Sequence, residues 1–223
     1  MPESSSAELS WPSRALLLAC AVAVYGVHFW PSPYLRDAAL AWLDYPEFAG
    51  FKGMFLPHLL LYSTLTALCA AIVWFVLVAN RLLPPPLLDS FSRRQFGLGV
   101  LGGLVALAAT LLFVYLIFPS GSLRWMDPVG WKIAGNVFSN FYEEFLYRGF
   151  FVVALTAALG FWPAAVLSSA MWAYTHTQYP MSLQLLIAGT GVFWCWLARK
   201  ARSLWAPYTS HMVLDVVADS LIG

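Results

Sequence analysis

Residues Asn136 to Phe150 have the sequence NVFSNFYEEFLYRGF, and they decide the fold because they lie inside a long apolar segment typical of a membrane span. Two adjacent carboxylates, Glu143 and Glu144, and the guanidinium of Arg148 would each cost about 3 kcal/mol to insert at that depth. A span that served only as an anchor would not carry them. The stretch therefore predicts a functional polar site inside a membrane helix.

Helical spacing divides these polar residues into two groups. At about 100° per residue, four of them fall within roughly 60° of one another and form one polar stripe: Asn136, Asn140, Glu143 and Tyr147. Glu144 and Arg148 are four residues apart, acid before base, which is the favourable order for a helical ion pair. Glu143 has no such partner in its own helix. We therefore expect Glu143 to do the chemistry and the Glu144–Arg148 pair to support it.

The composition is that of an integral membrane protein. The chain is 61% hydrophobic and 10% charged, with a mean hydropathy of +0.71, whereas soluble domains have about 25% charged residues. The net charge of +1 is uninformative about partners, and no basic patch indicates a nucleic-acid partner. Cys20, Cys69 and Cys195 have no metal-binding spacing and are expected to be buried apolar side chains.

Apolar runs predict an all-α, polytopic bundle of about seven spans: residues 14–30, 54–79, 96–118, 129–159, 163–176, 183–198 and 204–222. Residues 31–53 are expected to form a loop, although an eighth helix there stays open. We expect a disordered tail over 1–13, N-terminal transmembrane helices over 14–128 and a catalytic core over 129–223. Four glycines of the third span predict close helix contact: Gly97, Gly99, Gly102 and Gly103.

Positive charges predict the orientation. Most Arg and Lys residues fall in segments that are cytoplasmic if the N-terminus is inside, which places the C-terminus outside. The small size and the lack of a eukaryotic retention signal favour the bacterial cytoplasmic membrane.

The ionisable residues gather on the fourth, fifth and seventh spans. Ser168, Trp172 and His176 recur every four residues on the fifth, and His211, Asp215 and Asp219 do so on the seventh. Residues at this spacing share one helix face. The sequence therefore predicts a polar site where these three spans line a common cavity.

Three motifs in this region resemble the CPBP (CAAX protease and bacteriocin-processing, ABI) family of membrane proteins. Its EExxxR motif matches Glu143 to Arg148. Its FxxxH motif matches residues 172–176, where Trp172 replaces the Phe and His176 is the motif's His. Its third motif, a His followed four residues later by Asn or Asp, matches His211 to Asp215. Order and spacing agree over roughly residues 129–219.

The resemblance implies a glutamate-dependent intramembrane endopeptidase without a cofactor. In this family Glu143, helped by His176, would activate a water molecule, while His211 and Asp215 would orient and stabilise the oxyanion. An ionised Asp215 cannot donate to an oxyanion, so it would need a proton or would hold His211. The implied substrate is a membrane-bound protein or peptide, with a CAAX-type lipidated tail or a C-terminal sorting signal.

Two other functions stay open at this point. Glu143, His176 and His211 could bind zinc with one open position, a metal-dependent protease that we rank lower because no HExxH is present. The same buried groups could also serve a proton-coupled transporter or a non-catalytic membrane partner.

For the remaining residues we expect plain structural roles. Asn140 is interpreted as helix-packing support, Trp172 as an aromatic wall, and the other tryptophans as residues of the interfacial belts.

Overall fold

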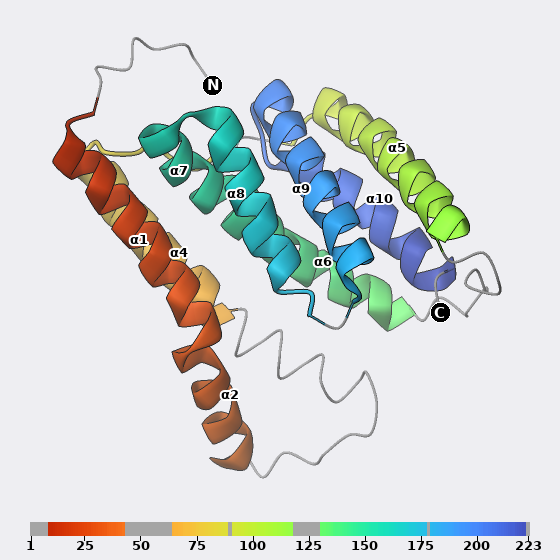
Figure 1. The fold of residues 1–223 in the computed structure, drawn as a ribbon, viewed down its shortest axis with the longest axis horizontal. Coiled ribbons are helices and arrows are strands. Elements are labelled where there is room, and N and C mark those ends of the chain that lie inside the picture. The colour runs from red at the N-terminus through yellow and green to blue at the C-terminus, as the bar shows by residue number, and fades with distance from the viewer. Residues whose placement is uncertain (1–8, 43–63, 89–90, 118–129, 178, 222–223) are drawn as a thin grey trace. The chain divides into compact units, whose positions relative to one another are not determined.

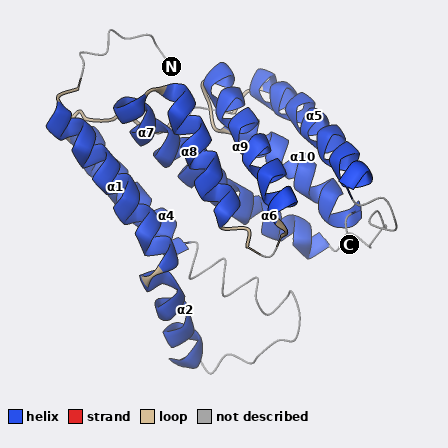
Figure 2. Ribbon diagram, viewed as in Figure 1, coloured by secondary structure: helices blue, strands red, loops and turns tan. Residues whose placement is uncertain are grey.

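The computed structural model describes residues 9–42, 64–88, 91–117, 130–177 and 179–221 (Figure 1). Most of these residues are helical, and no strand occurs among them (Figure 2). The helices are α1 Trp11–Phe29, α2 Pro31–Trp42, α4 Thr64–Ala79, α5 Arg93–Ile117, α6 Gly130–Glu143, η2 Glu144–Phe151, α7 Val152–Leu159, α8 Phe161–Tyr174, α9 Met181–Ala201 and α10 Trp205–Leu221.

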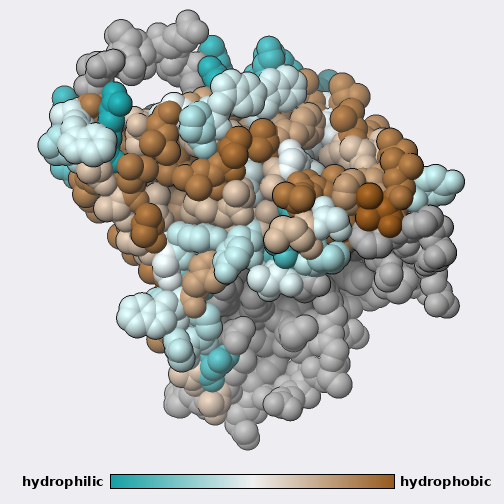
Figure 3. Space-filling model, viewed as in Figure 1, coloured by the Kyte–Doolittle hydropathy of each residue, from teal (hydrophilic) through white to brown (hydrophobic). Residues whose placement is uncertain are grey.

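The all-α membrane class predicted from the sequence is confirmed. Three helical segments of the described part are long and apolar enough to cross a membrane: Trp11–Leu35, Arg93–Ile117 and Met181–Ala201. Each has the roughly 20 apolar residues that a hydrocarbon core of about 30 Å requires. Large apolar side chains are widely exposed on the described surface (Figure 3), as a lipid-facing surface requires. The total number of spans stays a prediction.

The predicted spans lie close to the observed helices, with one correction. Residues 31–42 form helix α2 and not the expected loop. Pro31 and Pro33 occupy the first turn of α2, where a proline removes no intrahelical hydrogen bond because those N–H groups have no partner. Residues 43–53 of that loop, 54–63 of the second span, the 119–128 loop and residues 1–8 of the tail lie outside the described part.

Local signals explain where several helices begin and end. Ser92 Oγ accepts from the backbone N–H of Gln95, and Gln95 Oε1 accepts from that of Ser92, a reciprocal cap directly before α5. Gly160 has a φ of 85°, a left-handed conformation that glycine adopts without strain. It separates α7 from α8 and so ends the long helix that starts at Gly130.

The chain divides into two compact units. The first contains Leu87–Gly149 and Ala165–Gly223, and the second contains Pro2–Pro86 and Phe150–Ala164. In the second unit, α1 packs against α4 and α7, with Leu17, Val24 and Trp74 among its fully buried side chains. The first unit contains every residue singled out as a site candidate. The boundary expected between residues 128 and 129 stays a prediction.

Glycines bring α5 and α10 together in the first unit. A Cβ on Gly99 would lie 2.5 Å from the Thr209 Cβ, and one on Gly103 would lie 2.5 Å from the Val213 Cβ. Such distances are far inside van der Waals contact, so only glycine fits. Gly97 meets nothing within 4 Å and was wrongly included in the contact face. This contact fixes the position of α10, which carries His211 and Asp215.

Candidate active site

The two adjacent glutamates occupy different environments. The Glu143 side chain is 21% exposed, whereas that of Glu144 is 1% exposed. Glu143 ends α6 and Glu144 begins η2, so the helix changes its winding between them. Glu143 can therefore meet water, while Glu144 is enclosed by protein. The expected inequivalence of the pair is present in the structure.

Glu144 contacts two cationic side chains at once. Its Oε1 lies 3.5 Å from Arg148 Nη1, which is the ion pair predicted from the four-residue spacing. The same oxygen lies 2.9 Å from His211 Nδ1, on α10. A buried carboxylate needs such partners because desolvation of an isolated charge is costly. Glu144 thus links its own helix to the helix that carries His211.

Arg148 is held mainly by aromatic faces. Its Cζ lies 4.0 Å from the centre of the Trp172 ring and 5.1 Å from that of Trp194. Within the described part of the chain, none of its guanidinium nitrogens has a hydrogen-bond partner. Cation–π contact is strongest where water is excluded, and the Arg148 side chain is 0% exposed. The two tryptophans therefore replace the missing hydrogen bonds of this cation.

His211 lies among three carboxylates. Its Nδ1 faces Glu144, while its Nε2 lies 3.3 Å from Asp215 Oδ2 and 3.9 Å from Glu143 Oε2. A histidine can donate from both ring nitrogens only as the imidazolium. The geometry therefore fits a protonated His211. Asp215 meets His211 in this arrangement, which is the second of the two roles considered for it above.

Trp172, on α8, and His176, two residues beyond the end of that helix, make contacts that the spacing of the sequence did not predict. The Trp172 indole Nε1 donates to Glu143 Oε2 at 2.6 Å, so Trp172 is more than an aromatic wall. His176 makes neither an ion pair nor a hydrogen bond with Glu143, although such help was expected. Instead its Nδ1 lies 2.9 Å from the Trp172 carbonyl oxygen. Because that contact uses the Nδ1 proton, Nε2 is left as the basic nitrogen.

The helix that carries the glutamates is wound as a π-helix over η2. Such turns are rare and often mark functional sites. The Tyr147 carbonyl of η2 accepts a hydrogen bond from Ser168 Oγ at 2.7 Å, which ties η2 to α8. Asn140, one turn before Glu143, is 2% exposed and donates to Met212 Sδ on α10 at 3.6 Å. This contact agrees with its predicted packing role.

Trp194 lies beside the candidate site residues, although no sequence pattern singled it out. Its ring lies 4.1 Å from that of His211 and its Nε1 donates to Ser210 Oγ at 2.8 Å. Trp194 and Trp74 are at most 1% exposed, so the expectation that the tryptophans other than Trp172 form interfacial belts is wrong for these two. A lone tryptophan in an apolar run has no periodic signal to distinguish a buried position from an interfacial one.

The metal hypothesis depends on Glu143, His176 and His211. Among the residues that the structure describes, no three His, Cys, Asp or Glu side chains are grouped so that they could hold a metal ion. His211 Nε2 lies 3.9 Å from Glu143 Oε2, but the described side chains bring no third ligand of this kind to that pair. The described side chains therefore do not fit this ligand set.

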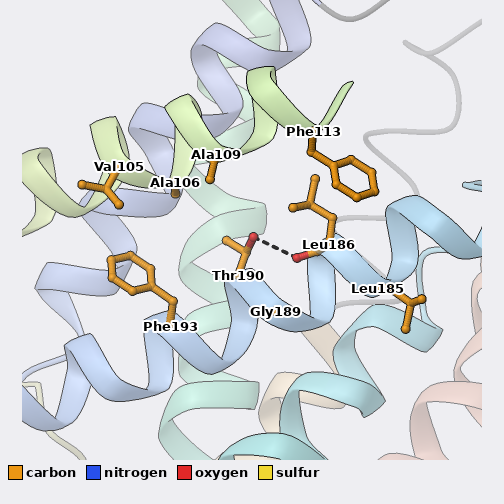
Figure 4. A pocket seen from close by; sticks show the side chains of 9 residues that line it. All are labelled: Val105, Ala106, Ala109, Phe113, Leu185, Leu186, Gly189, Thr190 and Phe193. Atoms are coloured by element: carbon orange, nitrogen blue, oxygen red, sulfur yellow. Dashed lines mark hydrogen bonds between the residues drawn. The ribbon is translucent and has the colours of Figure 1, made fainter. Parts of the chain in front are cut away.

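A separate pocket lies between α5 and α9 (Figure 4). It has a volume of about 370 Å³ and is lined by Val105, Ala106, Ala109, Phe113, Leu185, Leu186, Gly189, Thr190 and Phe193. The one side-chain hydroxyl in this lining donates to the Leu186 carbonyl of its own helix. The charged residues described above form one polar cluster: Glu143, Glu144, Arg148, His211 and Asp215. None of them lines the pocket. Its lining suits an apolar group and offers no group for hydrolysis.

Comparison with known protein families gives a match to the segment that carries these residues. Residues 124–217 match the family model described as type II CAAX prenyl endopeptidase Rce1-like. Neither a curated protein nor a solved structure gives a match. The matched segment contains all three motifs quoted above, with Glu143, Trp172, His176, His211 and Asp215 in place. Residues 124–217 are therefore similar to the Rce1-like CAAX proteases, which confirms the resemblance that the motifs predicted.

Proposed function

We propose that this chain is an intramembrane endopeptidase of glutamic type, which cleaves a peptide bond near the terminus of a membrane-associated protein. One observation carries the proposal: of two adjacent glutamates, Glu143 is open to water and Glu144 is buried against Arg148 and His211. The first can accept a proton from water, and the second can hold its surroundings in place. Catalytic acid–base pairs commonly divide their roles by such differences in environment.

Glu143 starts the reaction as the general base. Its carboxylate takes one proton from a water molecule, and the water oxygen forms a bond to the scissile carbonyl carbon. The electron pair of the C=O bond moves to its oxygen, which becomes the oxyanion. When the tetrahedral intermediate collapses, the C–N bond breaks and a proton passes to the leaving amine. Glu143 loses its proton in that second half and returns to the carboxylate.

The histidines act on the charges that develop. Glu144 and Asp215 hold the ring of His211, and its Nε2–H would be shared between Asp215 and the oxyanion. A fixed donor in a low-dielectric site stabilises an oxyanion better than mobile water does. Asp215 acts by holding His211 and need not itself donate. His176 Nε2, as the basic nitrogen, accepts the proton that Glu143 took from water and then delivers it to the leaving amine.

The substrate is a membrane-bound protein or peptide, either with a CAAX-type lipidated tail or with a C-terminal sorting signal. The match to an Rce1-like family model supports the first of these. The reaction as drawn needs no metal ion. The apolar helices place the chain in a membrane, and we propose the bacterial cytoplasmic membrane with the N-terminus inside.

The test compares protein termini by mass spectrometry in cells that contain wild type or Glu143→Gln at equal abundance. Glutamine keeps the shape of the side chain but cannot accept the proton. We expect termini that depend on wild type, and a loss of roughly 100- to 10,000-fold in cleavage of the corresponding peptide by the purified variant. The identified termini would also name the substrate.

Asp37→Asn is the matched control, because it removes a carboxylate of α2 outside the site. It should cleave like wild type. Activity that vanished with a strong chelator and returned with zinc would replace the glutamic mechanism by the metal-dependent one. Identical termini in wild type and Glu143→Gln cells would contradict proteolysis, and the buried carboxylates would then be examined for proton-coupled transport.

A further inference from the structure

Trp172 makes a contact that the family motif does not provide for. The motif has Phe at this position, and a phenyl ring has no hydrogen-bond donor, whereas an indole N–H donates. In this chain the indole Nε1 donates to Glu143 Oε2 at 2.6 Å. The Trp172 side chain is itself 3% exposed, so water competes little for this hydrogen bond.

The hydrogen bond distinguishes the two oxygens of Glu143. Oε2 receives the indole N–H and lies 3.9 Å from His211 Nε2. Oε1 has no hydrogen-bond partner among the described side chains. Because the Glu143 side chain is 21% exposed, water can reach the carboxylate at the oxygen that is not engaged. The arrangement therefore favours Oε1 as the oxygen that meets water.

The same indole connects Glu143 to the buried ion pair. The Arg148 guanidinium lies 4.0 Å above the Trp172 ring and pairs with Glu144. A cation over the ring face draws electron density from the indole and makes its N–H a stronger donor. Arg148 and Glu143 do not touch, so Trp172 provides their connection.

We propose that Trp172 is a positioning residue, whose indole N–H holds Oε2 of Glu143 so that Oε1 takes the proton from water. This inference rests on the proposed function, because it assigns the geometry of the same base. It concerns this chain in particular, since a phenylalanine at 172 could fill the same space without holding the carboxylate.

The first measurement follows the indole N–H resonances of the protein labelled with ¹⁵N at tryptophan, in micelles. Trp172→Phe deletes one resonance and so assigns it. We expect Glu143→Gln to shift the Trp172 indole proton upfield, since a neutral amide oxygen accepts more weakly than a carboxylate. The Trp74 resonance should stay in place, because that indole donates to the Pro84 carbonyl in the other unit. An unmoved Trp172 resonance would overturn the inference.

The second measurement separates kcat from KM for peptide cleavage. Trp172→Phe should lower kcat by about 10- to 100-fold and leave KM nearly unchanged, because one hydrogen bond to a charged group is lost while packing is kept. Trp74→Phe is the matched control, since it removes the indole donor of another buried tryptophan. It should keep both constants. Equal kcat values for Trp172→Phe and wild type would overturn the positioning role.

The two measurements separate this inference from the proposed function. If wild type has no peptidase activity, the proposed function is contradicted, and so is the catalytic part of this inference. If wild type is fully active but the Trp172 indole resonance is the same in wild type and Glu143→Gln, this inference alone is contradicted.

Discussion

At the scale of single residues, Glu144 determines how the charges of the site are arranged. It accepts from His211 and pairs with Arg148, while Asp215 and Glu143 lie on the other side of the His211 ring. Three carboxylates therefore surround two cations when His211 is protonated. This near balance allows several charges to remain in a site that is largely removed from water. Glu143 is the more water-accessible of the two adjacent glutamates, with its side chain 21% exposed against 1% for Glu144.

Removing the guanidinium of Arg148 should show how far the stability of the protein depends on the charge balance around Glu144. We expect Arg148→Met to lower the free energy of unfolding by about 3 to 5 kcal/mol, because Glu144 stays buried with one cation fewer. The double variant Arg148→Met with Glu144→Gln should recover part of that loss, since no uncompensated carboxylate remains. Thermal unfolding of the purified proteins in micelles measures both. Strictly additive losses in the double variant would contradict an energetic coupling between these two side chains.

At the scale of helices, the site depends on how α5 supports α10. Gly99 and Gly103 let the two helices approach until a Cβ would overlap Thr209 or Val213. In a bilayer, helix association depends on such close packing because lipid provides no hydrophobic driving force between helices. The π-helical winding of η2 is the second device at this scale, and it gives Glu144 and Arg148 their buried positions.

Alanine at the two ends of the glycine run should therefore act in opposite ways. Gly103→Ala places a Cβ 2.9 Å from the Ser210 carbonyl oxygen and 2.5 Å from the Val213 Cβ, so α10 must move and His211 with it. We expect a lower melting temperature and reduced cleavage. Gly97→Ala meets nothing within 4 Å and should be neutral or stabilising, by up to about 1 kcal/mol, because alanine favours helix. Equal melting temperatures for both variants would show that the close contact has no energetic weight.

At the scale of the whole molecule, the apolar helices and the buried charges fit a protein that works within the bilayer. The polar cluster lies entirely in the unit formed by Leu87–Gly149 and Ala165–Gly223. The apolar pocket of α5 and α9 belongs to the same unit but shares no residue with that cluster. The polar cluster and the apolar pocket are therefore separate features of one unit.

The orientation can be tested by fusing reporters to the C-terminus. With seven spans and the N-terminus inside, a periplasmic phosphatase fused after Gly223 should be active, and a cytoplasmic fluorescent protein fused there should be dark. The physical reason is that the positive loops resist translocation. The reverse pattern would indicate an even number of spans or an inverted insertion. A reporter fused ahead of the first span separates those two outcomes.

The sequence by itself determined the features that depend on composition and on periodicity along one chain. Its apolar runs predicted a helical membrane protein, and the positions of the helices agree with those runs. Four-residue spacing predicted the Glu144–Arg148 ion pair, because residues so placed are neighbours on any helix. Motif order predicted the family. The roles of Glu143, His176, His211 and Asp215 in catalysis stay predictions, to be decided by the experiments above.

Only the tertiary structure decided the contacts between helices. The hydrogen bond from Trp172 to Glu143, the contact of His211 with Glu144, and the burial of Trp194 depend on the rotation and distance of packed helices. Periodicity within one helix carries no information about that rotation. The π-helical winding of η2 was not predicted either, because the expected polar stripe assumed about 3.6 residues per turn throughout. Packing between helices therefore set the geometry of the candidate site, which the pattern along one chain does not contain.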